Sequence, residues 1–318
     1  MAIIQSISLF FTAVFLCLSL SFSQAQNASS LGFSADYGFL FLHSQDIAPI
    51  GQSYPWGMGV EYGYWLLKDS YWQNCHCYPK LGVAAAYHNY DNPDVLGFGI
   101  PLYGFFEPWY RLKGQTFLTL RGGVGMAWAS QPYNAETNPL NLSYSLPLSA
   151  FVMLGVGLSH KVNNKWEFGL QARYNHVSNG GFREPNKGLN YPTLNFTTNY
   201  ALQPFSLKEK TRKPFNPQER KKAVQLTLFA AGKAGGKVGE GVNEQEVTYL
   251  VSGLEWRYSH QVARSSALVL GGSFLNNQAY RKQIEKRNLS RSANQITLAA
   301  GHEFLLGKFR FAQVVGVY

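Results

Sequence analysis

The sequence predicts an all-β protein, a transmembrane antiparallel β-barrel of about 12 to 14 strands that follows a signal peptide. Three observations carry this prediction: the composition, an apolar leader, and a series of alternating segments long enough to cross a bilayer. Aromatic residues make up 15% of the 318 residues, 31 residues are glycine, and only 14% are charged. This mixture is typical of many strands joined by tight turns.

The leader is the segment 1–25. It has no charged side chain, and its apolar run from Ile7 to Phe22 is followed by Ser23-Gln24-Ala25, with small residues three and one positions before a cut after Ala25. This pattern predicts a signal peptide and export. Because the leader lacks Lys and Arg, an uncleaved membrane anchor is the alternative. No later stretch reaches the roughly 18 apolar residues of a membrane helix, so we expect spanning segments to be strands.

Thirteen segments alternate in polarity between turn signals, and most have the length of about 9 to 15 residues that suits tilted strands in a bilayer. The clearest is 145–160, where Leu148, Val152 and Leu158 share one face and Ser149 and Gly157 share the other. We therefore expect one face to meet lipid and the other to face the lumen. The segments lie near 32–43, 56–68, 80–90, 96–110, 115–129, 145–160, 165–178, 192–201, 222–231, 249–261, 266–280, 294–305 and 308–318.

The connections between these segments support a membrane barrel, because most alternate between long external loops and short periplasmic turns. Two connections, 69–79 and 202–221, are longer than the periplasmic side predicts. Single-chain bacterial barrels close with an even number of strands. An odd count therefore means that one segment is over-counted or that the sequence stops at Tyr318 before a final strand.

The net charge of +10 favours an anionic partner. Nucleic acid does not fit, because the chain is exported and carries no nucleic-acid motif, which leaves a phosphate-bearing lipid or an anionic polysaccharide. The only cysteines after the leader occur in Cys75-His76-Cys77, a cluster with too few ligands for a closed metal site. We expect free thiols or a small disulfide there, and neither a metal nor an organic cofactor.

The candidate catalytic residues lie at the end of the segment 165–178. Trp166, Leu170 and Tyr174 share one face, and His176 and Ser178 continue the same parity. Two-residue periodicity therefore places an imidazole and a hydroxyl side by side on the lipid-facing surface, at the outer rim. A histidine can activate a serine as nucleophile. By itself a His-x-Ser triplet is common and fits two interfacial rim residues better than a catalytic pair.

The run from His176 to Asn190 resembles the signature of the lipid A 3-O-deacylase family. It reads His-Val-Ser-Asn-Gly-Gly-Phe-Arg-Glu-Pro-Asn-Lys-Gly-Leu-Asn, and the match is free of gaps. Two earlier stretches, Phe41 to Ile47 and Gly59 to Gly63, also resemble the opening strands of that family. The likeness divides the predicted barrel of 26–318 into a deacylase-like part, 31–201, and additional strands, 202–318.

The resemblance implies a serine hydrolase with Ser178 as nucleophile and His176 as base. It places Asn179 at the oxyanion, and an amide of the glycine pair, Gly181, becomes a second oxyanion donor. The family carries a glutamate where this sequence has Asn190, so the acidic member of the triad is missing. An asparagine oxygen can still accept the imidazole N–H bond without supplying negative charge.

Three further loop residues remain candidates for the site. Glu184 is the nearest acidic alternative to Asn190 as the residue that orients the imidazole. Arg183 and Lys187 flank the motif, and we expect them to bind lipid A phosphates. As loop cations, they fit simple solvation equally well.

We therefore expect an enzyme of the bacterial outer membrane that removes an ester-linked acyl chain from lipid A of lipopolysaccharide in the outer leaflet. Whether the chain forms a homodimer is left open. The alternative function is a non-enzymatic barrel, a channel or structural protein with a decayed hydrolase site. A channel would keep an open polar lumen, and an adhesin-like surface protein would show long loops without activity.

Overall fold

The computed structural model describes residues 27–211, 214–238, 245–306 and 309–317, so the predicted signal peptide, 1–25, lies outside the described residues. Within these ranges the chain forms thirteen strands, one at each predicted position, and two α-helices, α2 (Asp69–Cys75) and α3 (Gln278–Lys286). Neither helix is long and apolar enough to cross a bilayer.

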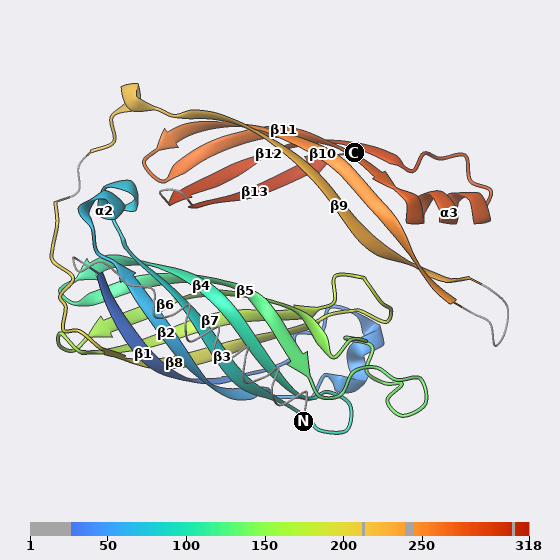
Figure 1. Cartoon of the computed structure of the whole chain (residues 1–318), viewed down its shortest axis with the longest axis horizontal. Helices are drawn as coiled ribbons and strands as arrows, with labels where there is room; N and C mark the ends of the chain where they lie inside the picture. The colour runs from blue at the N-terminus through green and yellow to red at the C-terminus, as the bar shows by residue number, and fades with distance from the viewer. Residues whose placement is uncertain (1–26, 212–213, 239–244, 307–308, 318) are drawn as a thin grey trace, which may run out of the picture.

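Eight strands form a closed antiparallel barrel (Figure 1). Each strand pairs with its neighbours in the sequence, and β1 and β8 complete the ring, with Ser30 opposite Ala201 and Gly38 opposite Thr193. The strands are β1 (Asn27–Gly38), β2 (Trp56–Leu66), β3 (Tyr78–Asn92), β4 (Gly97–Lys113), β5 (Thr116–Ala129), β6 (Leu148–Lys161), β7 (Trp166–Ser178) and β8 (Leu189–Ala201).

The predicted single barrel of 12 to 14 strands is wrong, because the remaining five strands form a separate sheet in the order β13-β12-β11-β10-β9. Since β8 pairs with β1, neither edge of the barrel is left for β9 to join. Alternating polarity alone does not reveal this closure. The strands of the sheet are β9 (Lys222–Val238), β10 (Gln245–Ala263), β11 (Ser266–Asn277), β12 (Asn294–Leu306) and β13 (Phe309–Val317).

The two connections that the sequence left unexplained lie together at one end of the barrel. The first contains α2, which is followed by a disulfide between Cys75 and Cys77. The second begins with 202–211, which fold back against the barrel end, where Leu207 is buried beside Trp65 and Trp109. The second connection then continues to the separate sheet. Their length therefore reflects a covered barrel end and a link between the two parts.

The lumen of the barrel is filled with paired charges. Lys80 Nζ lies 2.9 Å from Glu61 Oε1 and 3.2 Å from Glu167 Oε1, and Arg121 Nη1 lies 2.6 Å from Glu61 Oε2. Arg121 also binds Glu107, and all five side chains are buried. Buried charges are tolerated when they are paired in this way, so the lumen is a packed polar core.

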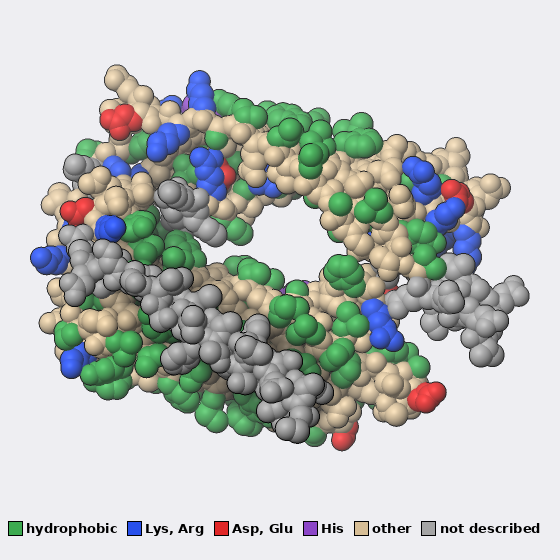
Figure 2. All heavy atoms as spheres, viewed as in Figure 1, with side chains coloured by type: hydrophobic (Ala, Val, Ile, Leu, Met, Phe, Trp, Pro, Cys, Tyr) green, Lys and Arg blue, Asp and Glu red, His purple; other side chains and the backbone are tan. Residues whose placement is uncertain are grey.

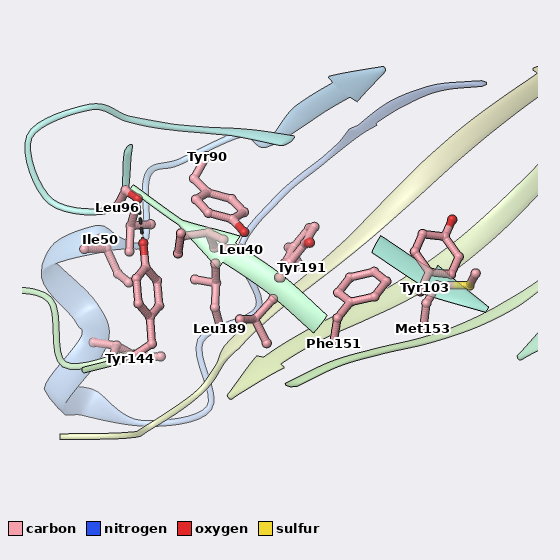
Figure 3. Packing of buried hydrophobic residues seen from close by; sticks show 14 of the residues in the cluster. Leu40, Ile50, Tyr90, Leu96, Tyr103, Tyr144, Phe151, Met153, Leu189 and Tyr191 are labelled. Carbon is pink, nitrogen blue, oxygen red and sulfur yellow. Dashed lines mark hydrogen bonds between the residues drawn. The ribbon is translucent and has the colours of Figure 1, made fainter. Parts of the chain in front are cut away.

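The outward faces of the same strands are apolar, with Leu31, Val60, Leu102, Val124 and Leu154 all exposed. Apolar side chains cover much of the outer surface in Figure 2. A buried apolar cluster, with Tyr90, Leu96 and Tyr144 among its members, closes the end of the barrel where β7 ends and β8 begins (Figure 3). An apolar exterior around a polar core is the inside-out arrangement of a membrane barrel.

Candidate active site

The strand β7 carries the predicted pair on the outer face of the barrel. Burial alternates strictly along it: Glu167, Gln171 and Arg173 are buried, whereas Leu170 and Tyr174 are exposed. His176 and Ser178 follow the parity of the exposed residues and are half-buried. The predicted facing of these two side chains is therefore confirmed.

Asn190 lies next to His176 because of strand register. Sequence reasoning expected the loop to last until residue 191, but β8 begins at Leu189. Asn190 is thus a strand residue directly opposite His176. Directly opposed residues of an antiparallel pair have side chains within contact distance. The structure therefore brings His176, Ser178 and Asn190 together.

Two hydrogen bonds connect these three side chains in a row. His176 Nδ1 lies 2.6 Å from Asn190 Oδ1, and His176 Nε2 lies 3.0 Å from Ser178 Oγ. Since Asn190 Oδ1 can only accept, Nδ1 carries the hydrogen, and Nε2 is free to accept the hydroxyl proton of Ser178. A nucleophile, a base and an orienting group that are hydrogen-bonded in this order can form and break an acyl bond.

Glu184 does not occupy the orienting position. Its carboxylate oxygen Oε2 accepts the Asn186 N–H at 3.0 Å, within the loop 179–188. The Nδ1 of His176 is already bonded to Asn190. Of the two orienting candidates from the sequence, Asn190 is the one that contacts the imidazole.

Asn179 holds the loop together. It is buried, and its Nδ2 donates to Ser145 Oγ at 3.0 Å and to the Arg183 carbonyl at 2.7 Å. Its Oδ1 accepts the Gly181 N–H at 2.9 Å. Both oxyanion donors expected from the sequence, Asn179 Nδ2 and Gly181 N–H, are thus engaged in bonds inside the loop.

The two flanking cations both lie at the surface of the loop. The Arg183 side chain is exposed. Lys187 Nζ lies 2.7 Å from Asp46 Oδ2, and both side chains are exposed. This hydrogen bond raises the pKa of the Lys187 ammonium and lowers the pKa of the Asp46 carboxyl. An anion that binds Lys187 must therefore compete with Asp46.

Sequence reasoning missed two residues of the site. Asn186 Oδ1 accepts the backbone N–H of Asn179, the residue after Ser178, at 2.9 Å. His43, from the connection between β1 and β2, lies 2.9 Å from Asn190 Nδ2 through its Nδ1 and 2.7 Å from the Lys187 carbonyl through its Nε2. Both residues stand in the stretches that resemble the deacylase family, but spacing gave neither of them a role.

Comparisons with known proteins agree with these features. The family model described as lipid A 3-O-deacylase matches residues 52–199, and a model described as acyloxyacyl hydrolase, C-terminal domain, matches residues 223–318. The first match contains His176, Ser178 and Asn190, and the second contains most of the separate sheet. No curated protein sequence matches the chain.

Several solved structures resemble part of the chain. Neisserial surface protein A is 10% identical, with 54% of this chain and 96% of that chain covered and a TM-score of 0.39. The outer membrane enzyme PagL is 19% identical, with 52% and 97% covered and a TM-score of 0.38. Ail, the attachment invasion locus protein of Yersinia pestis, is 11% identical, with 57% and 100% covered and a TM-score of 0.23.

The family assignment depends on the two family models, which together span most of the chain. The description of the first model is the activity that the resemblance of the motif predicted. The chain belongs to the lipid A 3-O-deacylase family and is an outer-membrane hydrolase that removes an ester-linked acyl chain from lipid A.

Proposed function

We propose that the chain performs this deacylation as a serine hydrolase, through an acyl-enzyme on Ser178. The single observation that carries the proposal is the hydrogen-bonded row Ser178–His176–Asn190 on the outer surface of the barrel. An ester in the outer leaflet reaches this surface without entering the lumen. The runner-up, a channel, is disfavoured by the paired charges of Lys80, Glu61 and Arg121 that fill the described lumen.

The reaction begins when Ser178 Oγ attacks the carbonyl carbon of the ester and its proton passes to His176 Nε2. The tetrahedral intermediate then collapses. The bond to the lipid A oxygen breaks, that oxygen takes the proton from His176, and the acyl group remains on Ser178. A water molecule, deprotonated by His176, attacks the acyl-enzyme, and the fatty acid leaves as Ser178 regains its proton.

The developing oxyanion needs hydrogen-bond donors. Asn179 and Gly181 would first have to release their bonds inside the loop. Asn186 differs, because its Oδ1 accepts the Asn179 N–H and no hydrogen bond among the described residues engages its Nδ2. We therefore assign the first oxyanion donor to the amide of Asn186 and keep Asn179 and Gly181 as the residues that shape the loop.

Substrate phosphates would be bound by the cations of the loop. Arg183 presents an exposed guanidinium, and the Lys187 ammonium is already oriented by Asp46. Guanidinium and ammonium groups are the usual partners of phosphate oxygens. These residues lie in the same loop as the glycines that follow Ser178, so a headgroup held there keeps its acyl ester near the nucleophile.

Ser178→Ala tests the mechanism. We expect deacylation to fall to background while the barrel folds normally, since the hydroxyl takes part in chemistry and contributes little to packing. Lipid A mass spectrometry reports the lost acyl group, and heat-modifiable gel migration reports folding. Ser149→Ala is the matched control, because Ser149 lies at the same rim on the lumen face and donates only to the Leu146 carbonyl. Normal lipid A processing by Ser178→Ala would refute the mechanism.

Asn190→Ala tests the orienting role. We expect a marked loss of turnover, because the tautomer of His176 is then no longer fixed; a wrong tautomer costs about 10⁴-fold in serine proteases. Asn190→Glu should keep or raise turnover, since a carboxylate also stabilises the imidazolium. Fatty acid released from purified lipopolysaccharide is the measurement. A fully active Asn190→Ala together with an inactive Glu184→Ala would transfer the role to Glu184.

A further inference from the structure

His43 is held against the site by the backbone around it. The Phe41 N–H donates to the Asn190 carbonyl at 2.9 Å, so the chain after β1 runs beside the beginning of β8. The 3-10 helix that follows, Gln45–Ile50, buries Ile47 and Ile50 in the apolar cluster at this barrel end. The imidazole of His43 thus has a fixed place beside the Asn190 side chain.

The hydrogen positions along this contact follow from elementary chemistry. The Lys187 carbonyl can only accept, so the His43 nitrogen that lies 2.7 Å from it, Nε2, carries a hydrogen. In the neutral ring, Nδ1 is then a bare acceptor. The group of Asn190 that faces this Nδ1 at 2.9 Å must therefore be the NH₂ end of the amide.

The orientation of the Asn190 amide determines where the hydrogen lies on the base, His176. With its NH₂ end turned to His43, Asn190 presents its oxygen to His176 Nδ1, which must carry a hydrogen. His176 Nε2 is then the bare nitrogen that accepts the Ser178 hydroxyl. If the amide were reversed, its NH₂ would face His176 Nδ1 and drive the ring into the tautomer that cannot deprotonate Ser178.

The acceptor that starts the series, the Lys187 carbonyl, belongs to a fixed peptide. The Lys187 N–H donates to the Leu142 carbonyl at 2.9 Å, and the Gly188 N–H donates to the Ser143 carbonyl at 2.8 Å. The peptide between Lys187 and Gly188 is thus anchored to the loop between β5 and β6. Its carbonyl cannot turn away from His43 without breaking the bond from the Gly188 N–H to the Ser143 carbonyl, because the two groups belong to the same planar peptide.

We propose that His43 is a positioning residue of the deacylase, which fixes the orientation of the Asn190 amide and through it the catalytic tautomer of His176. A carboxylate presents an acceptor whichever way it turns, whereas an amide does so in only one of its two orientations. This chain has Asn190 at the position where the family carries a glutamate. It therefore needs a second group that fixes which end of the Asn190 amide faces His176. This inference rests on the proposed serine mechanism.

Substitutions of His43 test the proposal. His43→Ala should lower kcat about tenfold to a hundredfold with KM unchanged. Nothing then fixes the orientation of the Asn190 amide, while the lipid-binding surface stays intact. His43→Asp should restore most of kcat, because either carboxylate oxygen can take the place of Nδ1 and accept the Asn190 amide. His43→Gln should stay low, since its amide reaches the place of Nε2 instead. The substrate is purified lipopolysaccharide in detergent micelles, and the readout is released fatty acid.

Ser44→Ala controls for disturbance of the loop, because Ser44 caps the 3-10 helix by accepting the Asp46 N–H but does not touch the Asn190 amide. It should keep wild-type kcat. A second background sharpens the test: in Asn190→Asp, both carboxylate oxygens accept, so adding His43→Ala should cost less than twofold. If Asn190→Asp proves inactive, the comparison of His43→Ala with His43→Asp decides alone.

Three results would overturn the positioning role: a wild-type kcat for His43→Ala, restoration by Gln but not by Asp, or an equal loss from His43→Ala in the wild-type chain and in the Asn190→Asp variant. Ser178→Ala is measured in the same series. If Ser178→Ala still deacylates, the serine mechanism fails. If Ser178→Ala is inactive while His43→Ala is normal, only the role of His43 fails.

Discussion

The barrel and the separate sheet are built from similar alternating strands but end differently. In the barrel, every strand has two paired neighbours, because β1 pairs with both β2 and β8. In the sheet, β9 and β13 each pair with one strand among the described residues. The sheet also exposes apolar side chains, with Val315 83% and Leu228 78% exposed. Strand pattern and strand closure are therefore separate properties of a sequence.

The two parts also treat charge differently. Arg121 lies inside the barrel, 3% exposed, between Glu61 and Glu107. Arg257 in the sheet binds Glu255, but both side chains remain more than a quarter exposed. The barrel thus depends on its buried pairs, whereas solvent or lipid headgroups can replace the pair of the sheet.

The largest expected effect comes from removing the arginine of the buried charge pairs in the barrel. Arg121→Met leaves Glu61 and Glu107 buried without that partner, and removal of one member of a buried pair costs about 3–5 kcal/mol. Arg257→Met in the sheet should cost about 0.2–1 kcal/mol, as for exposed pairs. Urea titration of the folded protein, followed by gel migration, measures both. Equal losses of unfolding free energy in the two variants would show that the sheet is as closely packed as the barrel.

A smaller effect is expected at Gly188, where the loop 179–188 meets the imidazole of His176. This position tests whether activity depends on the barrel rim. Gly188 has a φ of +78°, and a Cβ built there would lie 2.9 Å from His176 Cε1. Gly188→Ala should lower kcat about tenfold to a hundredfold, or about 1.4–2.7 kcal/mol, by displacing the imidazole.

The control for Gly188→Ala is Gly114→Ala in the β4–β5 turn. Gly114 has a φ of +53°, but a Cβ there would have no atom within 4 Å. Both variants share the backbone strain of a left-handed residue, and only Gly188→Ala reaches the site. A similar kcat for the two variants would mean that strain, and not contact with His176, explains any loss.

The smallest effect is expected from removing the sheet. A chain that ends at Thr211 keeps the eight barrel strands and the buried Leu207, as well as Lys210, which binds Asp69. Since all the site residues lie between His43 and Asn190, its deacylation rate should stay within about twofold of the full chain. Heat-modifiable migration and released fatty acid measure folding and activity. Failure of this shortened chain to fold would make the sheet a necessary part of the barrel.

Much of the fold was predictable from local pattern. Alternation located all thirteen strands of the described residues, because a two-residue period is imposed by strand geometry wherever the chain lies. The same period placed His176 and Ser178 on the outer face of β7. The motif from His176 to Asn190 indicated the family, since the residues that carry the chemistry are close in sequence.

By itself, the sequence therefore determined the strands, the outward face of the His176 and Ser178 pair, and the deacylase family. Only the tertiary structure decided that the barrel closes at eight strands, because closure depends on which distant strand meets the free edge of β1. It also decided that Asn190 lies opposite His176 and that His43 contacts Asn190 from 147 residues away. Register and contacts between distant segments leave no local periodicity, so they appear only once the chain is folded.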